Sequence, residues 1–120
     1  MKTVLVLGLV VLLVISFAVA TCSQTPEWTV YNTDNSGLPP DQVTALLFDD
    51  QGILWVGTRD GLAKFDGETW MVYNRVNSGL PDNFIWILLI DTRGNTWIGT
   101  HFGGLAVYRE GGVILTGVQE

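Results

Sequence analysis

Hydrophobic residues along the chain gather in short runs, and the polar residues between the runs are those that make tight turns. Two runs, Val43–Asp49 and Ile85–Asp91, are almost wholly apolar, which predicts central strands buried on both faces. The other runs are shorter and rich in β-branched and aromatic residues, as strands are. They are "ILWVGT" at 53–58, "GLAKFD" at 61–66, "ETWMVYN" at 68–74, "NTWIGT" at 95–100 and "GLAVYR" at 104–109. No sustained helical period follows residue 20, so we predict an all-β fold.

Two of the predicted turns have the same chemistry. Asp49–Gly52 and Asp91–Gly94 each place Asp first and Gly fourth, the pattern of a type I turn that closes a hairpin. We therefore interpret Asp49 and Asp91 as turn-forming residues rather than as a pair of catalytic carboxylates.

The chain repeats itself. The segments Trp28–Gly61 and Trp70–Gly103 align at an offset of 42 with 17 identities in 34 columns, and both contain the phrase "NSGLP". Each repeat unit holds four predicted strands. Four antiparallel strands in about 40 residues is the blade of a β-propeller. We interpret "NSGLP" as the joint between one blade and the next.

Two repeats predict two blades and no more. An outer strand at "EWTVYN" and a first blade fill 27–67, the remaining outer strand and a second blade fill 68–111, and 112–120 is a tail. Propellers close with about 4 to 8 blades. Two alternatives follow: an incomplete propeller from a longer chain, or an oligomeric ring such as three chains giving six blades. The second blade lacks its own outer strand, and either "EWTVYN" or Val113–Val118 is expected to supply it.

The N-terminus has the layout of a secretory signal. Lys2 precedes an apolar run from residue 4 to residue 20, which ends in the triplet Ala18-Val19-Ala20. This layout predicts a signal peptide at 1–20 and an exported protein, with a retained anchor as the rival interpretation. Residues 19–22 resemble a bacterial lipobox, so Cys22 is a candidate lipidated residue. We expect a periplasmic, extracellular or lipid-anchored location.

Charge excludes several functions. Lys2 is one of six basic residues, so the remainder has five basic against 12 acidic residues and a net charge of −7. An acidic chain without a Lys/Arg cluster is not expected to bind nucleic acid or to form a basic helix on a membrane surface. We therefore expect membrane contact only through the signal segment or a lipid anchor. One cysteine forms no internal disulfide, and no cofactor or metal motif is present.

The conserved phrase of each repeat resembles a known family. "NSGLP" followed by "WVGT" at Trp55–Thr58, or by "WIGT" at Trp97–Thr100, is similar to the two-component regulator propeller repeat. The resemblance implies an exported β-propeller that senses ligands, often carbohydrates, as part of a histidine kinase. The 120 residues contain neither the kinase nor a second membrane segment, so we do not expect the signalling role of this chain alone.

Candidate binding residues are those that differ between the repeats inside a constant surrounding. The first set is Arg59, Asp60, His101 and Phe102, and the second set, before the central strands, is Asp41, Gln42, Asn83, Phe84 and Trp86. Polar members can hydrogen-bond sugar hydroxyls, and aromatic members can stack on a sugar face. The alternative is that they are solvated turn residues. His101 is the only histidine, so we predict no enzyme. We expect an oligosaccharide-binding module, or a structural or protein-interaction module without a small ligand.

Overall fold

The computed structural model describes residues 26–115, which contain seven strands and no helix. The chain divides into two compact units, Met1–Val30 and Tyr31–Glu120, and all seven strands belong to the second. The first unit contributes only residues 26–30, which form no strand. The predicted signal peptide and Cys22 lie outside the described residues, and so does the last part of the predicted tail.

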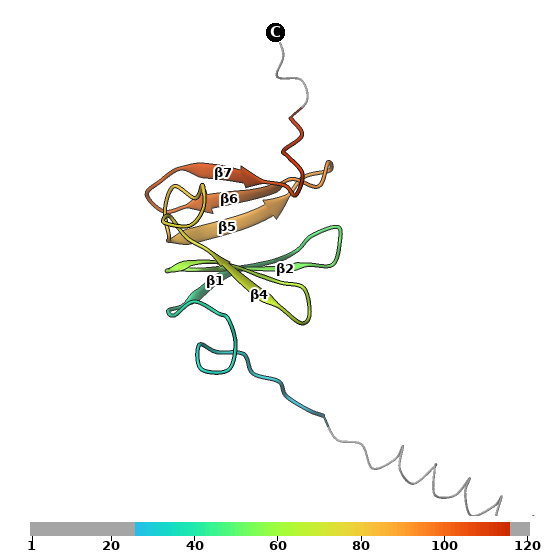
Figure 1. Cartoon of the computed structure of the whole chain (residues 1–120), viewed down its shortest axis with the longest axis vertical. Helices are drawn as coiled ribbons and strands as arrows, with labels where there is room; N and C mark the ends of the chain where they lie inside the picture. The colour runs from blue at the N-terminus through green and yellow to red at the C-terminus, as the bar shows by residue number, and fades with distance from the viewer. Residues whose placement is uncertain (1–25, 116–120) are drawn as a thin grey trace, which may run out of the picture. The chain divides into compact units, whose positions relative to one another are not determined.

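The first sheet has four antiparallel strands in the order of the sequence. They are β1 (Val43–Phe48), β2 (Leu54–Thr58), β3 (Gly61–Phe65) and β4 (Trp70–Tyr73). Each strand pairs with the next, which makes the sheet a simple meander (Figure 1). The prediction of a four-stranded antiparallel blade is confirmed.

The second sheet repeats this arrangement with three strands. It consists of β5 (Ile85–Ile90), β6 (Thr96–Thr100) and β7 (Leu105–Tyr108), again in sequence order. The register of β5 on β6 shifts between Ile85 and Ile87, as the register of β1 on β2 shifts between Val43 and Ala45. The repeat in the sequence is therefore a repeat in backbone geometry down to the position of the bulge.

We predicted that one of two segments would supply the outer strand of the second blade, and neither forms a strand in its described residues. Residues 27–32 form no strand, and neither do residues 113–115 at the described part of the tail. A strand exists only beside another strand's free edge. The outer edge of β3 is already paired with β4, and the described residues place no strand on the outer edge of β7. Within residues 26–115 the second sheet therefore has three strands.

The Asp-first turns are confirmed, and the structure explains why a tryptophan follows each of them. The carboxylate of Asp49 accepts hydrogen bonds from main-chain N–H groups of its own turn and from the indole Nε1 of Trp55 at 2.9 Å. Asp91 accepts equivalent bonds, with Trp97 Nε1 at 2.8 Å. Gly52 closes the first turn with a φ of +80°, which favours glycine. Each carboxylate thus fixes both a turn and the next strand.

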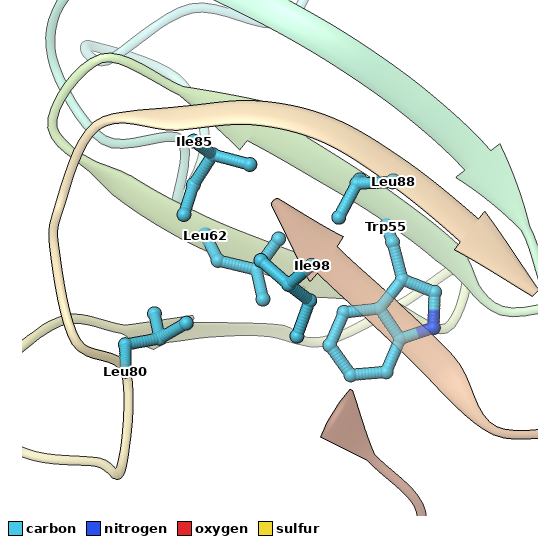
Figure 2. Packing of buried hydrophobic residues seen from close by; sticks show 6 residues of the cluster. All are labelled: Trp55, Leu62, Leu80, Ile85, Leu88 and Ile98. Carbon is cyan, nitrogen blue, oxygen red and sulfur yellow. The ribbon is translucent and has the colours of Figure 1, made fainter. Parts of the chain in front are cut away.

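The hydrophobic core lies between the two sheets. One cluster of buried residues draws its members from both repeats, and Figure 2 shows their side chains: Trp55, Leu62, Leu80, Ile85, Leu88 and Ile98. Ile85 is fully buried, and its Cγ2 lies against the main chain of Gly57 in β2. Complete burial of such a side chain contributes about 1.5–3 kcal/mol. Leu80 extends the core from the second "NSGLP", which confirms that this loop joins the sheets.

The prediction that both central strands are buried on two faces is wrong. Among the described residues each sheet packs against one other sheet, so each central strand keeps an open face. On the first sheet the open face is formed by Val43, Leu46 and Phe48, and we call it the first open face. On the second sheet it is formed by Ile87, Leu89 and Leu105, and we call it the second open face. Leu46 is 65 % exposed and Leu89 is 61 % exposed.

Candidate ligand-binding surface

The loops that carry the candidate residues meet at one end of the two sheets. The turn between β2 and β3 is bonded to the segment before β1, because Arg59 N–H donates to the carbonyl of Gln42 at 3.1 Å. The turn between β6 and β7 is bonded in the same way, with His101 N–H donating to the carbonyl of Phe84 at 3.0 Å. A third bond, from Gly61 N–H to the carbonyl of Asn83 at 2.8 Å, connects the two repeats. Backbone hydrogen bonds therefore hold the candidate loops together.

Aromatic rings cluster at this end of the second sheet. The ring of His101 stacks on Phe84 at a centroid distance of 4.7 Å and lies 5.1 Å from Trp86. Phe102 meets His101 edge-on at 4.0 Å. Trp86 is 59 % exposed, and Phe102 is more exposed still. The cluster thus presents apolar ring surface to the solvent.

Arg59 of the first repeat joins this cluster across the boundary between the sheets. Its guanidinium carbon lies 5.1 Å from the centroid of Phe84, a cation–π distance. Beside it is an open hollow of about 380 Å³. The hollow is lined by Gln42, Val43, Thr44, Arg59, Phe84 and Trp86.

Two of the predicted residues, one from each set, occupy other surroundings. The side-chain oxygen of Asn83 accepts a hydrogen bond from the N–H of Arg75 at 2.8 Å, so this amide holds the loop before β5. Asp60 is exposed in the β2–β3 turn and does not line the hollow. Phe84 brings Arg59 and His101 together, and Phe102 contacts His101. Arg59 lines the hollow, whereas His101, Phe102, Asn83 and Asp60 do not.

Sequence reasoning ranked one important position too low and missed another. Trp86 is central in the structure, while its repeat counterpart Thr44 donates a hydroxyl hydrogen bond to the carbonyl of Ile85 at 2.6 Å. The contrast between Thr and Trp at one repeat position was the available signal. Asp82 was missed because it follows the proline of "NSGLP" and looks like a loop residue.

Asp82 orients the aromatic cluster. Its carboxylate accepts hydrogen bonds from the main-chain N–H groups of Phe102 at 2.9 Å and Phe84 at 3.3 Å. The bond from Phe102 is the main cause that lowers the pKa of Asp82 below its usual range. A carboxylate that stays ionised keeps both loops in place at neutral pH.

Another polar cluster connects the sheets through Lys64. Its ammonium lies 2.9 Å from the carboxylate of Glu110, which also accepts a hydrogen bond from the hydroxyl of Tyr108. Burial, followed by the bond to Glu110, raises the pKa of Tyr108 well above its usual range. Tyr108 is therefore neutral at physiological pH, and its ring packs edge-on against Trp55 at 5.1 Å. This arrangement is explained by packing.

Residues 26–115 contain neither a metal-binding cluster nor a membrane-spanning helix. No group of three His, Cys, Asp or Glu side chains there could hold a metal ion. No helix in that range is long and apolar enough to cross a bilayer. His101 has aromatic neighbours, with no nucleophile or carboxylate bonded to its ring in these residues.

The fold defines the class of protein. Four antiparallel strands in sequence order, packed face to face on a repeat of the same arrangement, are β-propeller blades. A scan of family models matches the two component regulator propeller at residues 37–60 and again at residues 79–102. Both repeats of the chain therefore match the model of this family, as the sequence indicated. A search of curated proteins found no match.

Proposed function

We propose that this chain is an exported propeller module that binds an oligosaccharide at the hollow between Arg59 and Trp86. The observation that carries the proposal is the exposed aromatic cluster of the second repeat, with the guanidinium of the first repeat beside it. Cation, amide and ring surface converge there from loops that the backbone holds fixed. Loops on a rigid β-scaffold are the usual place for binding residues.

The chemistry of the hollow suits a sugar. The indole of Trp86 offers a flat apolar surface on which the C–H face of a pyranose ring can stack. Arg59 supplies N–H donors, and the amide of Gln42 supplies a donor and an acceptor for hydroxyl groups. A volume of about 380 Å³ falls within the range of about 300–1,000 Å³ found for small-ligand sites.

Charge narrows the ligand class. The chain has a net charge of −6, and Arg59 is the only cationic side chain that lines the hollow. A polyanion would be repelled by the rest of the molecule. Neutral oligosaccharides are therefore favoured over sulfated or phosphorylated ones.

The experiment is a glycan array followed by titration calorimetry on the purified chain. We expect binding of at least one neutral glycan, and Trp86→Ala should abolish it because the stacking surface is lost. Arg59→Ala should weaken binding, whereas Arg93→Ala serves as the matched control. Arg93 is also an exposed arginine, but it lies in the turn between β5 and β6, away from the hollow. If no glycan binds, or if Trp86→Ala binds as well as the wild type, the proposal is wrong.

Export is proposed on the N-terminal segment alone. Intact-mass analysis of the chain recovered from fractionated bacteria tests it. Cleavage after Ala20, or a mass increase from lipid on Cys22, would support export. Recovery of the full 120 residues in the cytosolic fraction would refute it.

A further inference from the structure

We propose that a second copy of this chain docks head-to-tail on the second sheet. Its first open face covers the second open face, and its residues 28–31 pair with β7 as the missing fourth strand. Both contacts follow from one operation, the one that relates the first sheet to the second within the chain. The proposal is independent of any ligand.

The packing of the second sheet on the first, within one chain, shows which residues of the second copy would enter this interface. Ile85 and Leu88 of β5, with Leu80 of the preceding loop, bury themselves against the first sheet. Their repeat counterparts are Val43, Leu46 and Leu38. The first open face therefore has the side chains that already form such an interface once in the chain.

The surface on which the second copy would dock is also repeated within the chain. The second sheet packs against Trp55, Gly57 and Leu62 of the first sheet. Their repeat counterparts, on the second open face, are Trp97, Gly99 and Leu105. Leu62 is 2 % exposed, but Leu105, which nothing in the described chain covers, is 64 % exposed. The two leucines are equivalent in the repeat, so the surface that Leu105 exposes and Leu62 does not is what the second copy would bury.

The missing strand has an obvious donor. Residues 28–31 read Trp-Thr-Val-Tyr and stand at the repeat positions of Trp-Met-Val-Tyr in β4. In the first sheet Trp70 packs directly against Gly37, while the equivalent glycine of the second repeat, Gly79, faces open space. A hollow of about 340 Å³ lies there, and its lining includes Gly79, Leu80 and Ala106. Trp28 and Val30 of a second copy would fill it as Trp70 and Val72 fill the same place in the first sheet.

Tyr31 is already in position for this role. Its ring lies 5.6 Å from Phe65, which matches the 5.9 Å between Tyr73 and Tyr108. Tyr73 also stacks on Trp55 of its own sheet at 6.2 Å. The counterpart of that contact for Tyr31 is Trp97 of another copy.

The loop after Tyr31 fixes the direction in which the chain continues. Ser36 Oγ donates to the carbonyl of Asn32 at 2.5 Å, and Ser78 Oγ donates to that of Asn74 at the same distance. Leu38 N–H then donates to Ser36 Oγ at 3.2 Å, as its counterpart in the second loop does to Ser78. Because both loops have the same internal bonds, they connect an outer strand to the next sheet with the same geometry.

The copy–copy interface is expected to be more apolar than the internal one. Val107 replaces Lys64, so the ion pair with Glu110 is not repeated. Each copy carries a net charge of −6, so association should strengthen as salt screens the repulsion. A head-to-tail contact of this kind closes into a ring, and about 4 to 8 blades require about two to four copies.

Sedimentation velocity of the purified chain with two face variants tests the proposal. Leu89→Asp blocks the second open face, and Leu46→Asp blocks the first open face. Both side chains are exposed in the single chain, so both variants should fold. The wild type should sediment as two to four copies and each variant as a monomer. An equimolar mixture of the variants should form one dimer that grows no further. Val76→Asp is the matched control, because Val76 is 94 % exposed and its repeat counterpart is Asp34.

A cross-link tests the strand. Lys64 pairs with Met71 in the first sheet, so Thr29 and Val107 are the corresponding pair between copies. In a Cys22→Ser background, Thr29→Cys with Val107→Cys should give a covalent ladder under oxidation, and Thr29→Cys with Thr92→Cys should not. A wild type that sediments as a monomer overturns the proposal. That result is expected if further blades of a longer polypeptide, rather than a second copy, cover these faces. A mixture of face variants that stays monomeric, or a ladder from the control pair, also overturns the proposal.

Discussion

Replacing Gly57 with alanine tests the packing between the sheets. A Cβ atom at this position would lie 2.6 Å from Cγ2 of Ile85, a distance that real Cβ contacts do not reach. Ile85 is fully buried, so it has no free space into which to rotate. Overpacking of this kind costs about 1–3 kcal/mol. The lower chain entropy of alanine in the unfolded state offsets about 0.4–1 kcal/mol of it. The central values of these two ranges leave a net destabilisation of about 1.3 kcal/mol.

The chain contains a matched control for this change. Gly99 is the counterpart of Gly57, and a Cβ there would also lie 2.6 Å from a Cγ2, that of Ile87. Ile87 is 58 % exposed, so it can turn into solvent. We expect Gly99→Ala to be neutral or slightly stabilising. A Cβ atom would thus meet the same close contact at both glycines, but the isoleucine that it meets is buried at Gly57 and exposed at Gly99.

The assay is urea denaturation followed by tryptophan fluorescence, at one protein concentration, in the Leu46→Asp background, which blocks the association proposed above. The double variant Gly57→Ala/Ile85→Ala should be more stable than the sum of its single changes, because the new methyl group occupies part of the vacated space. A coupling of about 0.5–3 kcal/mol is typical for residues in contact. If Gly57→Ala is as stable as the wild type, or Gly99→Ala costs as much as Gly57→Ala, the account of this core is refuted.

Three further predictions concern the polar groups. The pKa values of Asp82, Asp91 and Glu110 are lowered by folding, so the unfolded chain takes up protons first, and acid denaturation should show stability falling as the pH drops below about 4–5. Lys64→Met should change stability by less than about 1 kcal/mol in urea titrations, because the Glu110 side chain is 75 % exposed; a larger loss would contradict a surface ion pair. Ser78→Ala removes two loop hydrogen bonds worth about 0.5–1.5 kcal/mol each, and an unchanged urea midpoint would show that the bonds contribute nothing.

The order of strands was predictable because short-range rules decide it. The alternation of apolar runs with turn residues located all seven strands, and the doubled "NSGLP" located the joint between the blades. The turn at Asp49–Gly52 could be predicted for the same reason, since an Asx side chain bonds to main-chain groups only two to four residues away. Such contacts depend on neighbours in the sequence.

The candidate site was only partly predictable. Differences between the repeats pointed to Arg59 and His101, but not to the distance between them. That distance depends on Phe84, whose ring contacts Arg59 and stacks on His101. The anchoring role of Asp82 was also invisible, because the N–H group of Phe102 that it binds lies 20 residues further along the chain.

The sequence by itself determined the blades and their order, because repeated local patterns encode both. Tertiary structure decided which faces are covered. Leu88 and Leu46 are the same residue at the same repeat position, yet one is buried and the other is 65 % exposed. Burial depends on whether another sheet lies opposite, and the local sequence carries no information about that neighbour. The same reason separates β4 from residues 28–31, since a strand forms only where the free edge of another strand receives its hydrogen bonds.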